Sequence, residues 1–186
     1  MLLLAAVREE LGDLEGEIVG IGPVLAAIRT AALVERHRPD SVLLIGTAGA
    51  YPGGPEIGQA VIATTVGLSP GVAAMGLGYV PRQPKPVSCD PAITDALNLL
   101  GVRVLSVGAV TTDVQLSDRL SDGWDVEHME AFGVALACQE AGVPFAAIMG
   151  IASRVGPENH TLWLTHRTAA QHVCRQAIAP LFGSSE

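Results

Sequence analysis

The sequence predicts an α/β fold, a three-layer α/β/α sandwich with a mixed central sheet. Short apolar runs that are typical of buried strands alternate with segments whose apolar residues recur at helical spacing. Glycines and prolines stand at most junctions between these runs, where turns are expected. The chain has 186 residues, the length of one domain, and shows neither an internal repeat nor a clear boundary. We therefore expect a single domain over residues 1–186.

The first half of the chain alternates strand and helix patterns. LLLAAV at 2–7 is a continuous apolar run, as in a strand that is covered on both faces. A brief strand is expected at 17–22, followed by a helix at 23–38 that opens with a proline and keeps the 3.6-residue apolar period. Further buried strands are expected at 41–46 and 58–66.

The second half opens with residues 67–88, which are rich in Gly and Pro and predict a long loop on the substrate side. The segment 90–101 predicts a helix, because Asp90 suits the N-cap, Pro91 the first turn and Gly101 the C-terminal end. The other elements expected, in chain order, are a strand at 102–110, a short segment at 115–123, a helix at 125–141, a strand at 143–151, a helix at 165–181 and a frayed tail at 183–186.

Residues 125–156 hold the strongest local signal for a site. Glu127 and Glu130 are three residues apart, so they share a face of the expected helix. A carboxylate on an apolar face is costly to bury unless it is paired, which makes such a group a site candidate. The next strand is followed by a short polar loop with Ser153 and Arg154, at the sheet edge where α/β folds bind ligands. The alternative is a core helix whose acids lie in a solvated first turn.

Composition restricts the partners. Hydrophobic residues make up 49% of the chain and charged residues only 16%, so we expect apolar surface to be covered in a homo-oligomer, a dimer or larger. The net charge of −8 and the pI near 5.0 argue against a nucleic-acid partner. No apolar run reaches the length of a membrane span, so no membrane partner is expected. The widely spaced Cys89, Cys138 and Cys174 indicate free thiols and a cytoplasmic protein.

Motifs that would imply other chemistry are missing from the sequence. Neither the GxGxxG nor the Walker spacing occurs, which argues against dinucleotide and nucleoside triphosphate binding. No serine stands in a GxSxG context, which argues against an α/β-hydrolase elbow. The five histidines include no HExxH pair. We therefore expect no cofactor and no metal site.

Two ordered blocks carry a resemblance to a known family. The first is VGIGPVLAAIRTAALVERHRPDSVLLIGTAGAYPGGPEIGQAVIA at 19–63, and the second is VEHMEAFGVALACQEAGVPFAAIMGIAS at 126–153. Both resemble the nucleoside phosphorylase and nucleosidase superfamily, and GTAGAYPG and GIASRVGPEN are most similar to its futalosine hydrolases. The resemblance implies a phosphorylase/hydrolase-like fold, shortened near the N-terminus, and a nucleosidase that acts on a small-molecule purine nucleoside.

The resemblance also implies roles for individual residues. Glu10 would activate the attacking water, with Glu9 one position away as the alternative. Met129 and Glu130 would bind the ribose, and the Glu130 carboxylate would stabilise positive charge on the sugar. Ser153 would contact the purine as the second catalytic residue. The substrate-binding positions that complete the set are Thr47, Ala48, Gly49 and Thr112.

Differences from the family pattern concern the nucleophile and the leaving group. Phosphorylases need cationic groups to hold phosphate, and residues 42–45 are apolar where the phosphorylase pattern has an arginine, so water is the expected nucleophile. Ser153 stands where the family has Asp or Asn, and Met149 stands where it has Arg. The link from Glu10 to the GIGP turn is shorter than in the family, which predicts a smaller sheet.

The expected function is hydrolysis of futalosine to hypoxanthine and dehypoxanthinyl futalosine, a reaction of menaquinone biosynthesis. One alternative is a methylthioadenosine/adenosylhomocysteine-type nucleosidase or a purine nucleoside phosphorylase. The other is a catalytically degenerate protein that only binds a nucleoside, an interpretation that Ser153 and Met149 favour.

Overall fold

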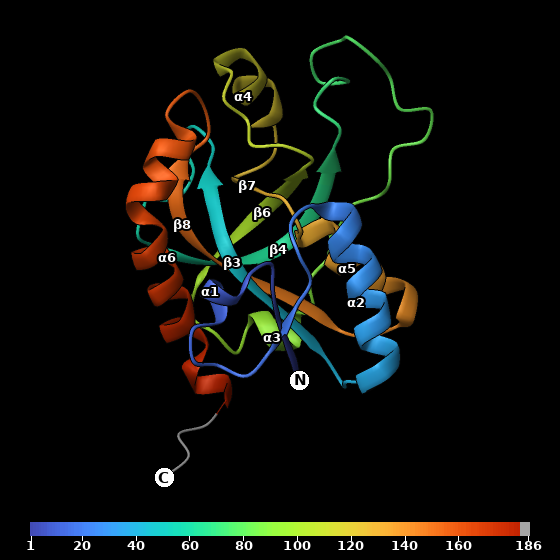
Figure 1. Ribbon diagram of the computed structural model, residues 1–186. Coiled ribbons are helices and arrows are strands. Elements are labelled where there is room, and N and C mark those ends of the chain that lie inside the picture. The colour runs from blue at the N-terminus through green and yellow to red at the C-terminus, as the bar shows by residue number, and fades with distance from the viewer. Residues whose placement is uncertain (183–186) are drawn as a thin grey trace.

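The computed structural model describes residues 1–182 and places helices on both sides of one mixed sheet (Figure 1). This confirms the predicted α/β fold, whereas the tail at 183–186 lies outside the described residues. The strands are β1 (Leu2–Ala5), β2 (Glu17–Ile18), β3 (Val42–Ala50), β4 (Ala60–Ser69), β5 (Val87–Ser88), β6 (Leu100–Val107), β7 (Val126–His128) and β8 (Phe145–Arg154). The helices are α1 (Arg8–Leu11), α2 (Pro23–His37), α3 (Pro91–Thr94), α4 (Val114–Leu120), α5 (Ala131–Ala141) and α6 (Asn159–Phe182).

The centre of the sheet closes into a ring. β3 pairs with β8, β8 with β4, β4 with β6 and β6 with β7, and β7 returns to β3. β1 and β2 extend the sheet beyond β3, and β5 pairs with β4. β1, β3 and β8 run parallel to one another, so their carboxyl ends lie at the same end of the molecule.

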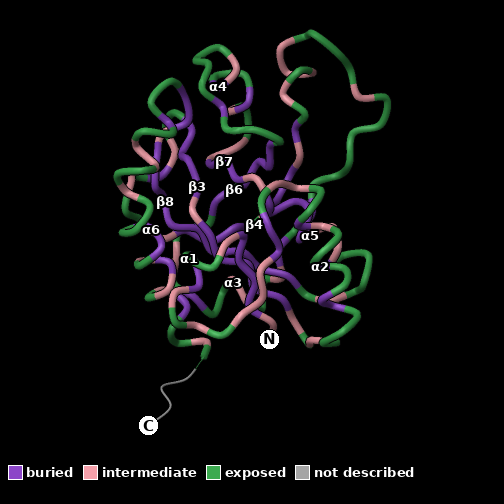
Figure 2. Tube along the Cα trace, in the orientation of Figure 1, coloured by how far each residue is buried: buried purple, intermediate pink, exposed green. Residues whose placement is uncertain are grey.

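Both faces of β3 are covered, which explains its continuous apolar run. Val42 and Leu44 belong to the core cluster that includes α2 and α5, whereas Leu43 and Ile45 belong to the cluster that includes α6. Figure 2 shows this arrangement, with the sheet strands mostly buried and the outer surface of α2 largely exposed. No helix within residues 1–182 is both long and apolar enough to cross a membrane.

The N-termini of α2 and α5 lie side by side because a glycine allows them to. Gly133, in the first turn of α5, contacts the backbone of α2 so closely that a Cβ would collide with the Pro23 carbonyl oxygen. Two helix N-termini, each with a positive dipole end, therefore lie at the same place.

The helix predicted at 125–141 is wrong at its start. Residues 126–128 form β7, which pairs with β3 and β6, and the helix begins only at Ala131. Glu127 and Glu130 therefore share no helical face. Glu127 points from a strand, and Glu130 is the N-cap residue of α5.

α5 begins at this point because its first N–H groups find acceptors on side chains. His128 Nδ1 accepts hydrogen bonds from the N–H groups of Glu130 and Ala131, at 3.1 Å each. Ser106 Oγ accepts a hydrogen bond from the N–H of Phe132 at 2.9 Å. These acceptors satisfy donors that a helix start otherwise leaves unpaired.

The helix predicted at 90–101 is wrong over most of its length. α3 stops at Thr94, although Asp90 caps it as expected by accepting a backbone hydrogen bond at 2.8 Å. Leu100 and Gly101 pair with β4 as the start of β6. The hydrogen bonds of the sheet override the helical pattern of this short segment.

Other elements differ from the prediction at their ends. β3 continues to Ala50, beyond the predicted end at 46, and β4 continues to Ser69, beyond the predicted end at 66. α6 starts at Asn159, six residues before the predicted position. β8 runs on to Arg154, so Ser153 lies in a strand and not in a loop.

Candidate functional site

A cavity of about 300 Å³ lies beside the carboxyl ends of β1, β7 and β8, next to the first turns of α5 and α6. This volume is at the lower end of the range for small-molecule sites. Every predicted site residue except Thr112 lines it. The cavity is lined by Ala6, Val7, Glu10, Ile21, Thr47, Ala48, Gly49, Val110, Glu127, His128, Met129, Glu130, Ser153, Asn159, His160 and Trp163.

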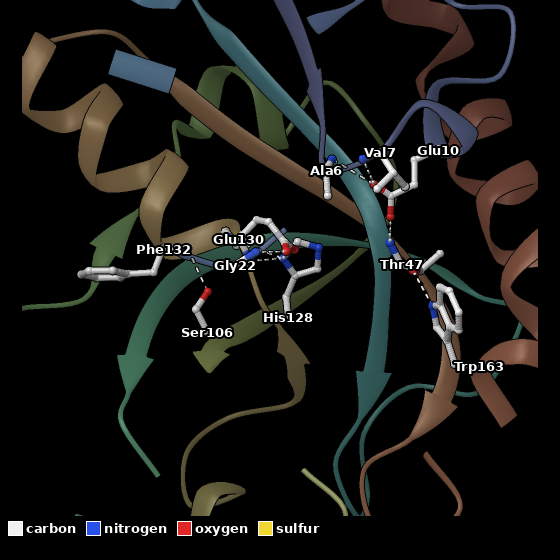
Figure 3. A network of polar contacts seen from close by, with 11 residues as sticks. Ala6, Val7, Glu10, Gly22, Thr47, Ser106, His128, Glu130, Phe132 and Trp163 are labelled. Atoms are coloured by element: carbon white, nitrogen blue, oxygen red, sulfur yellow. Dashed lines mark hydrogen bonds and ion pairs between the residues drawn. The ribbon is translucent and has the colours of Figure 1, made fainter. Parts of the chain in front are cut away.

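Glu10 is buried in α1, directly after β1, and backbone N–H groups fix its carboxylate (Figure 3). Oε2 accepts from Ala6 at 3.0 Å and from Val7 at 3.4 Å, and Oε1 accepts from Thr47 at 3.1 Å. Burial raises the pKa of Glu10 above its ordinary value of 4.5, and the nearby Glu130 adds to this, while the N–H groups of Thr47 and Ala6 oppose it. The result is a carboxylate in one orientation with reduced acidity, as a general base requires.

Glu9 does not share this environment. Its side chain is exposed and does not line the cavity, whereas that of Glu10 is buried in the cavity wall. Arg175 of α6 donates hydrogen bonds to the carbonyl oxygens of both residues, at 3.3 and 3.1 Å, and so ties α1 to the rest of the fold. Of the two acids that the sequence left open, Glu10 is the one with access to a bound ligand.

Glu130 lies between the N-termini of α2 and α5. Its Oε1 accepts a hydrogen bond from the N–H of Gly22, the N-cap residue of α2, at 2.7 Å. Burial raises the pKa of Glu130 to about 7, although backbone donors, that of Gly22 first, oppose the shift. Met129, half-buried, lines the cavity next to it. The carboxylate therefore has Oε1 held by a backbone N–H, while its Oε2 lies 3.4 Å from His128 Nδ1.

Thr47, Ala48 and Gly49 form the floor of the cavity on β3. The Thr47 hydroxyl oxygen accepts a hydrogen bond from Trp163 Nε1 at 3.0 Å, which fixes the indole of α6 over this wall (Figure 3). His160 stacks on the outer side of Trp163, with 6.0 Å between ring centroids. An aromatic wall beside a polar floor suits a ligand with a flat ring.

The opposite end of the cavity holds a chain of hydrogen bonds that joins side chains through the Thr111 backbone. Ser153 Oγ donates to Asn159 Oδ1 at 2.6 Å, and Asn159 Nδ2 donates to the Thr111 carbonyl oxygen at 3.3 Å. The Thr111 N–H donates to Glu127 Oε1 at 3.0 Å, and the Tyr51 hydroxyl donates to Glu127 Oε2 at 3.1 Å. Burial raises the pKa of Glu127.

Gly49 opens the space between the two ends of this chain. It is the partner of Glu127 in β7 and of Ser153 in β8, so the three residues form one row across the sheet. Directly opposed residues of neighbouring strands point to the same face. A Cβ on Gly49 would lie 3.1 Å from both Ser153 Oγ and Val155 Cγ2, so the missing side chain keeps this row free of a close contact.

Comparison with known proteins identifies the family of this chain. The model of the Phosphorylase superfamily matches residues 16–180. The chain belongs to this superfamily. The futalosine hydrolase of Thermus thermophilus is 32% identical over an alignment that covers 88% of each chain. The 5′-methylthioadenosine/S-adenosylhomocysteine nucleosidase of Bacillus subtilis is also 32% identical, covering 80% of this chain and 74% of that protein.

Solved structures share the fold of this superfamily member. The 5′-methylthioadenosine/S-adenosylhomocysteine nucleosidase of Neisseria meningitidis, in complex with methylthio-immucillin-A, superposes with a TM-score of 0.84 at 19% identity and covers 97% of both chains. The futalosine hydrolase of Helicobacter pylori superposes with a TM-score of 0.80 at 17% identity, covering 95% of this chain and 94% of that one. The enzyme class expected from the sequence is that of these relatives.

Two sequence-based expectations for this superfamily member do not fit the cavity. Thr112 is exposed and lies outside the cavity wall, because its neighbour Asp113 leads the chain away as the N-cap of α4. No residue of 67–88 lines the cavity either, although that segment was expected on the substrate side. In addition, Met149, which stands where the family has Arg, is fully buried in the core and lies outside the cavity wall.

Several lining residues were missed by the sequence interpretation. Asn159 and Trp163 lie at the start of α6, which was predicted to begin only at 165. The polar PEN segment after Gly156 was a usable signal, since Asn is favoured at helix starts. His128 was overlooked because the expected helix placed it in an ordinary first turn. Within residues 1–182, the cavity wall includes no lysine or arginine.

Proposed function

We propose that this protein is a nucleosidase that hydrolyses the N-glycosidic bond of a purine nucleoside, and that its substrate is futalosine. The products are hypoxanthine and dehypoxanthinyl futalosine. The observation that carries the proposal is the Glu10 carboxylate, fixed by backbone N–H groups in a cavity whose wall also holds the Glu130 carboxylate. This pairing supplies a base for water and an anion for the sugar.

Glu10 acts as general base in the proposed reaction. It takes a proton from a water molecule, whose oxygen attacks the anomeric carbon of the ribose as the bond to the purine nitrogen breaks. The electron pair of that bond leaves with the purine. Burial has already reduced the acidity of Glu10, which makes its carboxylate a better proton acceptor.

Glu130 and Met129 bind the ribose. The Glu130 oxygen that Gly22 does not occupy accepts hydrogen bonds from ribose hydroxyls, and its negative charge stabilises the positive charge that the sugar develops. Met129 packs against the sugar ring, and Thr47, Ala48 and Gly49 border it from β3. Because this charge appears only as the bond breaks, the interaction favours the transition state.

Ser153 acts on the purine through Asn159. Its hydroxyl proton is directed to Asn159 Oδ1, so the serine orients the amide and does not itself donate to the base. The second N–H of Asn159 Nδ2 has no protein acceptor among residues 1–182 and is free for a purine ring nitrogen. A hydrogen bond of this kind weakens the bond to the sugar without transferring a proton.

The electrostatics of the cavity support water as nucleophile. A phosphorylase must hold a dianionic co-substrate, and Arg or Lys is the usual partner for phosphate. In the described part of the chain, the charged groups of the wall are carboxylates. Their negative field disfavours phosphate beside Glu10 and Glu130.

The relatives also support a second candidate, hydrolysis of methylthioadenosine or adenosylhomocysteine. A nucleosidase of that type is as similar in sequence, at 32% identity, as the futalosine hydrolase. The two substrates differ in the base, because hypoxanthine has an acceptor oxygen where adenine has an amino group. They also differ in the group on the 5′ carbon of the ribose. The base end of the cavity, at Ser153 and Asn159, is therefore one of the two places where the choice between them is made.

We further propose that the protein works as a cytoplasmic homo-oligomer. Ile21, Val24 and Ile28 at the start of α2 are 61%, 71% and 64% exposed, an apolar stripe that a second copy would cover. The three cysteines are free and buried, as suits a reducing compartment. Light scattering on the purified protein gives the mass, and a monomer at all concentrations would contradict this proposal.

The test of the proposed function is chromatography of the bases released from a panel of nucleosides, with and without phosphate. We expect hypoxanthine from futalosine at the same rate in both buffers, with kcat/KM at least about 10-fold above that for methylthioadenosine. Faster release of adenine would favour the second candidate. A phosphate-dependent rate would identify a phosphorylase, and calorimetric binding without any release would identify a protein that only binds nucleosides.

A further inference from the structure

His128 is a buried member of the cavity wall that the proposed reaction does not yet use. Its Nδ1 accepts two backbone hydrogen bonds, from Glu130 and Ala131, at 3.1 Å each. A ring nitrogen that accepts carries no proton, so the proton of the neutral imidazole is on Nε2. Burial lowers the pKa of His128 to about 4, which keeps the ring neutral.

The contact of His128 Nδ1 with Glu130 Oε2, at 3.4 Å, is therefore not an ion pair. Nδ1 has no proton to offer, and the ring has no charge near neutral pH. The hydrogen bonds to Nδ1 instead fix the plane of the ring, so that the Nε2–H has one direction (Figure 3).

The Nε2–H of His128 and the carboxylate of Glu10 converge above Gly46. A Cβ on Gly46 would lie 2.8 Å from His128 Nε2 and 3.3 Å from Glu10 Oε1. Since Gly46 has no side chain, nothing from β3 separates the donor from the acceptor. The space they share faces the cavity that both residues line.

We propose that His128 is a further catalytic residue, whose Nε2–H donates a hydrogen bond to the water molecule that Glu10 activates. This inference rests on the proposed function. The water gives one proton to Glu10 and receives the hydrogen bond of His128 on one lone pair. Its other lone pair forms the bond to the anomeric carbon, the glycosidic electron pair leaves with the purine, and the purine takes up a proton from solvent.

A neutral donor suits this position for an electrostatic reason. Three carboxyl groups already lie in the wall, and a fixed N–H orients the nucleophile without the desolvation that a buried cation would require. A donor and an acceptor together determine both the place and the orientation of a water molecule, which Glu10 alone does not.

The alternative role of His128 is structural, because its Nδ1 caps the start of α5. Two substitutions separate the roles. In His128→Asn, the side-chain oxygen can take the place of Nδ1 and keep the cap, but no donor reaches the position of Nε2. In His128→Gln, the longer amide can bring an N–H near the position of Nε2 but no longer caps the helix.

The experiment measures kcat, KM and thermal midpoint for the wild type, His128→Asn and His128→Gln. We expect His128→Asn to keep its midpoint within about 4 °C and its KM within about 3-fold while kcat falls about 10- to 100-fold. His128→Gln should retain more of kcat than His128→Asn despite a lower midpoint. A His128→Asn variant with wild-type kcat would overturn the proposal. So would a kcat that falls in both variants only in proportion to the loss of thermal midpoint.

Two further outcomes are informative. If the wild type releases no base from any nucleoside, the proposed function and the role of His128 are both overturned, whereas an active wild type with an equally active His128→Asn overturns His128 alone. Should His128→Asn not fold, Gly46→Ala replaces it. Its methyl group would lie 2.8 Å from Nε2 and 3.3 Å from Oε1 and would displace the ring from the water, so we expect the same loss of kcat. A wild-type kcat in this variant would overturn the proposal.

Discussion

The two ends of the cavity are built in different ways. At the sugar end, backbone N–H groups hold the carboxylates, with Ala6, Val7 and Thr47 on Glu10 and Gly22 on Glu130. At the base end, the side chains of Ser153 and Asn159 bond to each other, and the Thr111 backbone links Asn159 to Glu127. A backbone donor survives most substitutions nearby, whereas a side-chain contact is lost with either partner. The sugar end is therefore suited to the chemistry and the base end to the choice of substrate.

The largest effect should come from Glu10→Gln at the sugar end. An amide cannot accept the proton of water, so we expect kcat to fall about 10²- to 10⁴-fold, measured as base release by chromatography. The matched control is Glu9→Gln, which changes the exposed neighbour and should leave kcat within about 2-fold. Equal losses in both variants would show that Glu10 is not the base.

Glu130→Gln should have the next largest effect and should alter the pH profile. Burial raises the pKa of Glu130 to about 7, so the ionised acceptor is lost as the pH falls through 7. Below that pH, we expect kcat/KM of the wild type to decrease by up to about 10-fold for each pH unit. In the variant, kcat/KM should be about 100-fold lower near pH 8, without this limb. If kcat/KM of the variant still falls below pH 7, the titration belongs to another group.

The same substitution should change the stability of the protein with pH. Because the folded-state pKa of Glu130 is raised from 4.5, its contribution to stability is fully present below pH 4.5 and is lost as the pH rises through 7. Glu130→Gln should therefore be more stable relative to the wild type at pH 8 than at pH 5, by about 1 to 3 kcal/mol in denaturant unfolding. The opposite sign would contradict the raised pKa.

A smaller effect should follow from substitutions at the base end. Asn159→Ala removes the group that donates to the purine, so we expect kcat/KM to fall about 10- to 100-fold. Ser153→Ala leaves the amide in place but loses its orientation, and should cost less, about 3- to 10-fold. The variants are compared on futalosine and methylthioadenosine in the same assay. A greater loss for Ser153→Ala would indicate that the serine contacts the base itself.

The smallest effect is expected for Thr112→Ala. The exposed side chain lies outside the cavity wall, so kcat/KM should stay within about 2-fold of the wild-type value. The matched change inside the wall is Thr47→Ala, which removes the acceptor of Trp163 Nε1 and should weaken substrate binding by more than this. A marked effect of Thr112→Ala would mean that the 111–113 segment closes on the substrate.

Much of the sugar end was predictable from the sequence because its residues lie in short motifs. Glu10 follows directly on an apolar strand, and Thr47 and Glu130 stand within blocks that resemble the superfamily. The fold class was predictable for the same kind of reason, since buried strands such as 41–46 are visible as apolar runs.

The base end was less predictable because its contacts join distant parts of the chain. Ser153 meets Asn159 only because β8 leads directly into the start of α6, and Asn159 reaches Thr111 across 48 positions of sequence. No local pattern encodes such contacts. The helix expected at 125–141 fails for a related reason, since pairing of β7 with β3 and β6 depends on strands that are remote in sequence. That error hid His128, whose role depends on the start of α5.

The most direct test of the account is the fate of heavy oxygen from labelled water during turnover of futalosine in phosphate buffer. If water is the nucleophile, the sugar product carries the heavy oxygen on its anomeric carbon, and mass spectrometry finds it there in the wild type when the reaction is stopped before the free hemiacetal exchanges its oxygen with the solvent. Release of the base with formation of a sugar 1-phosphate, or of a sugar without the label, would contradict the account.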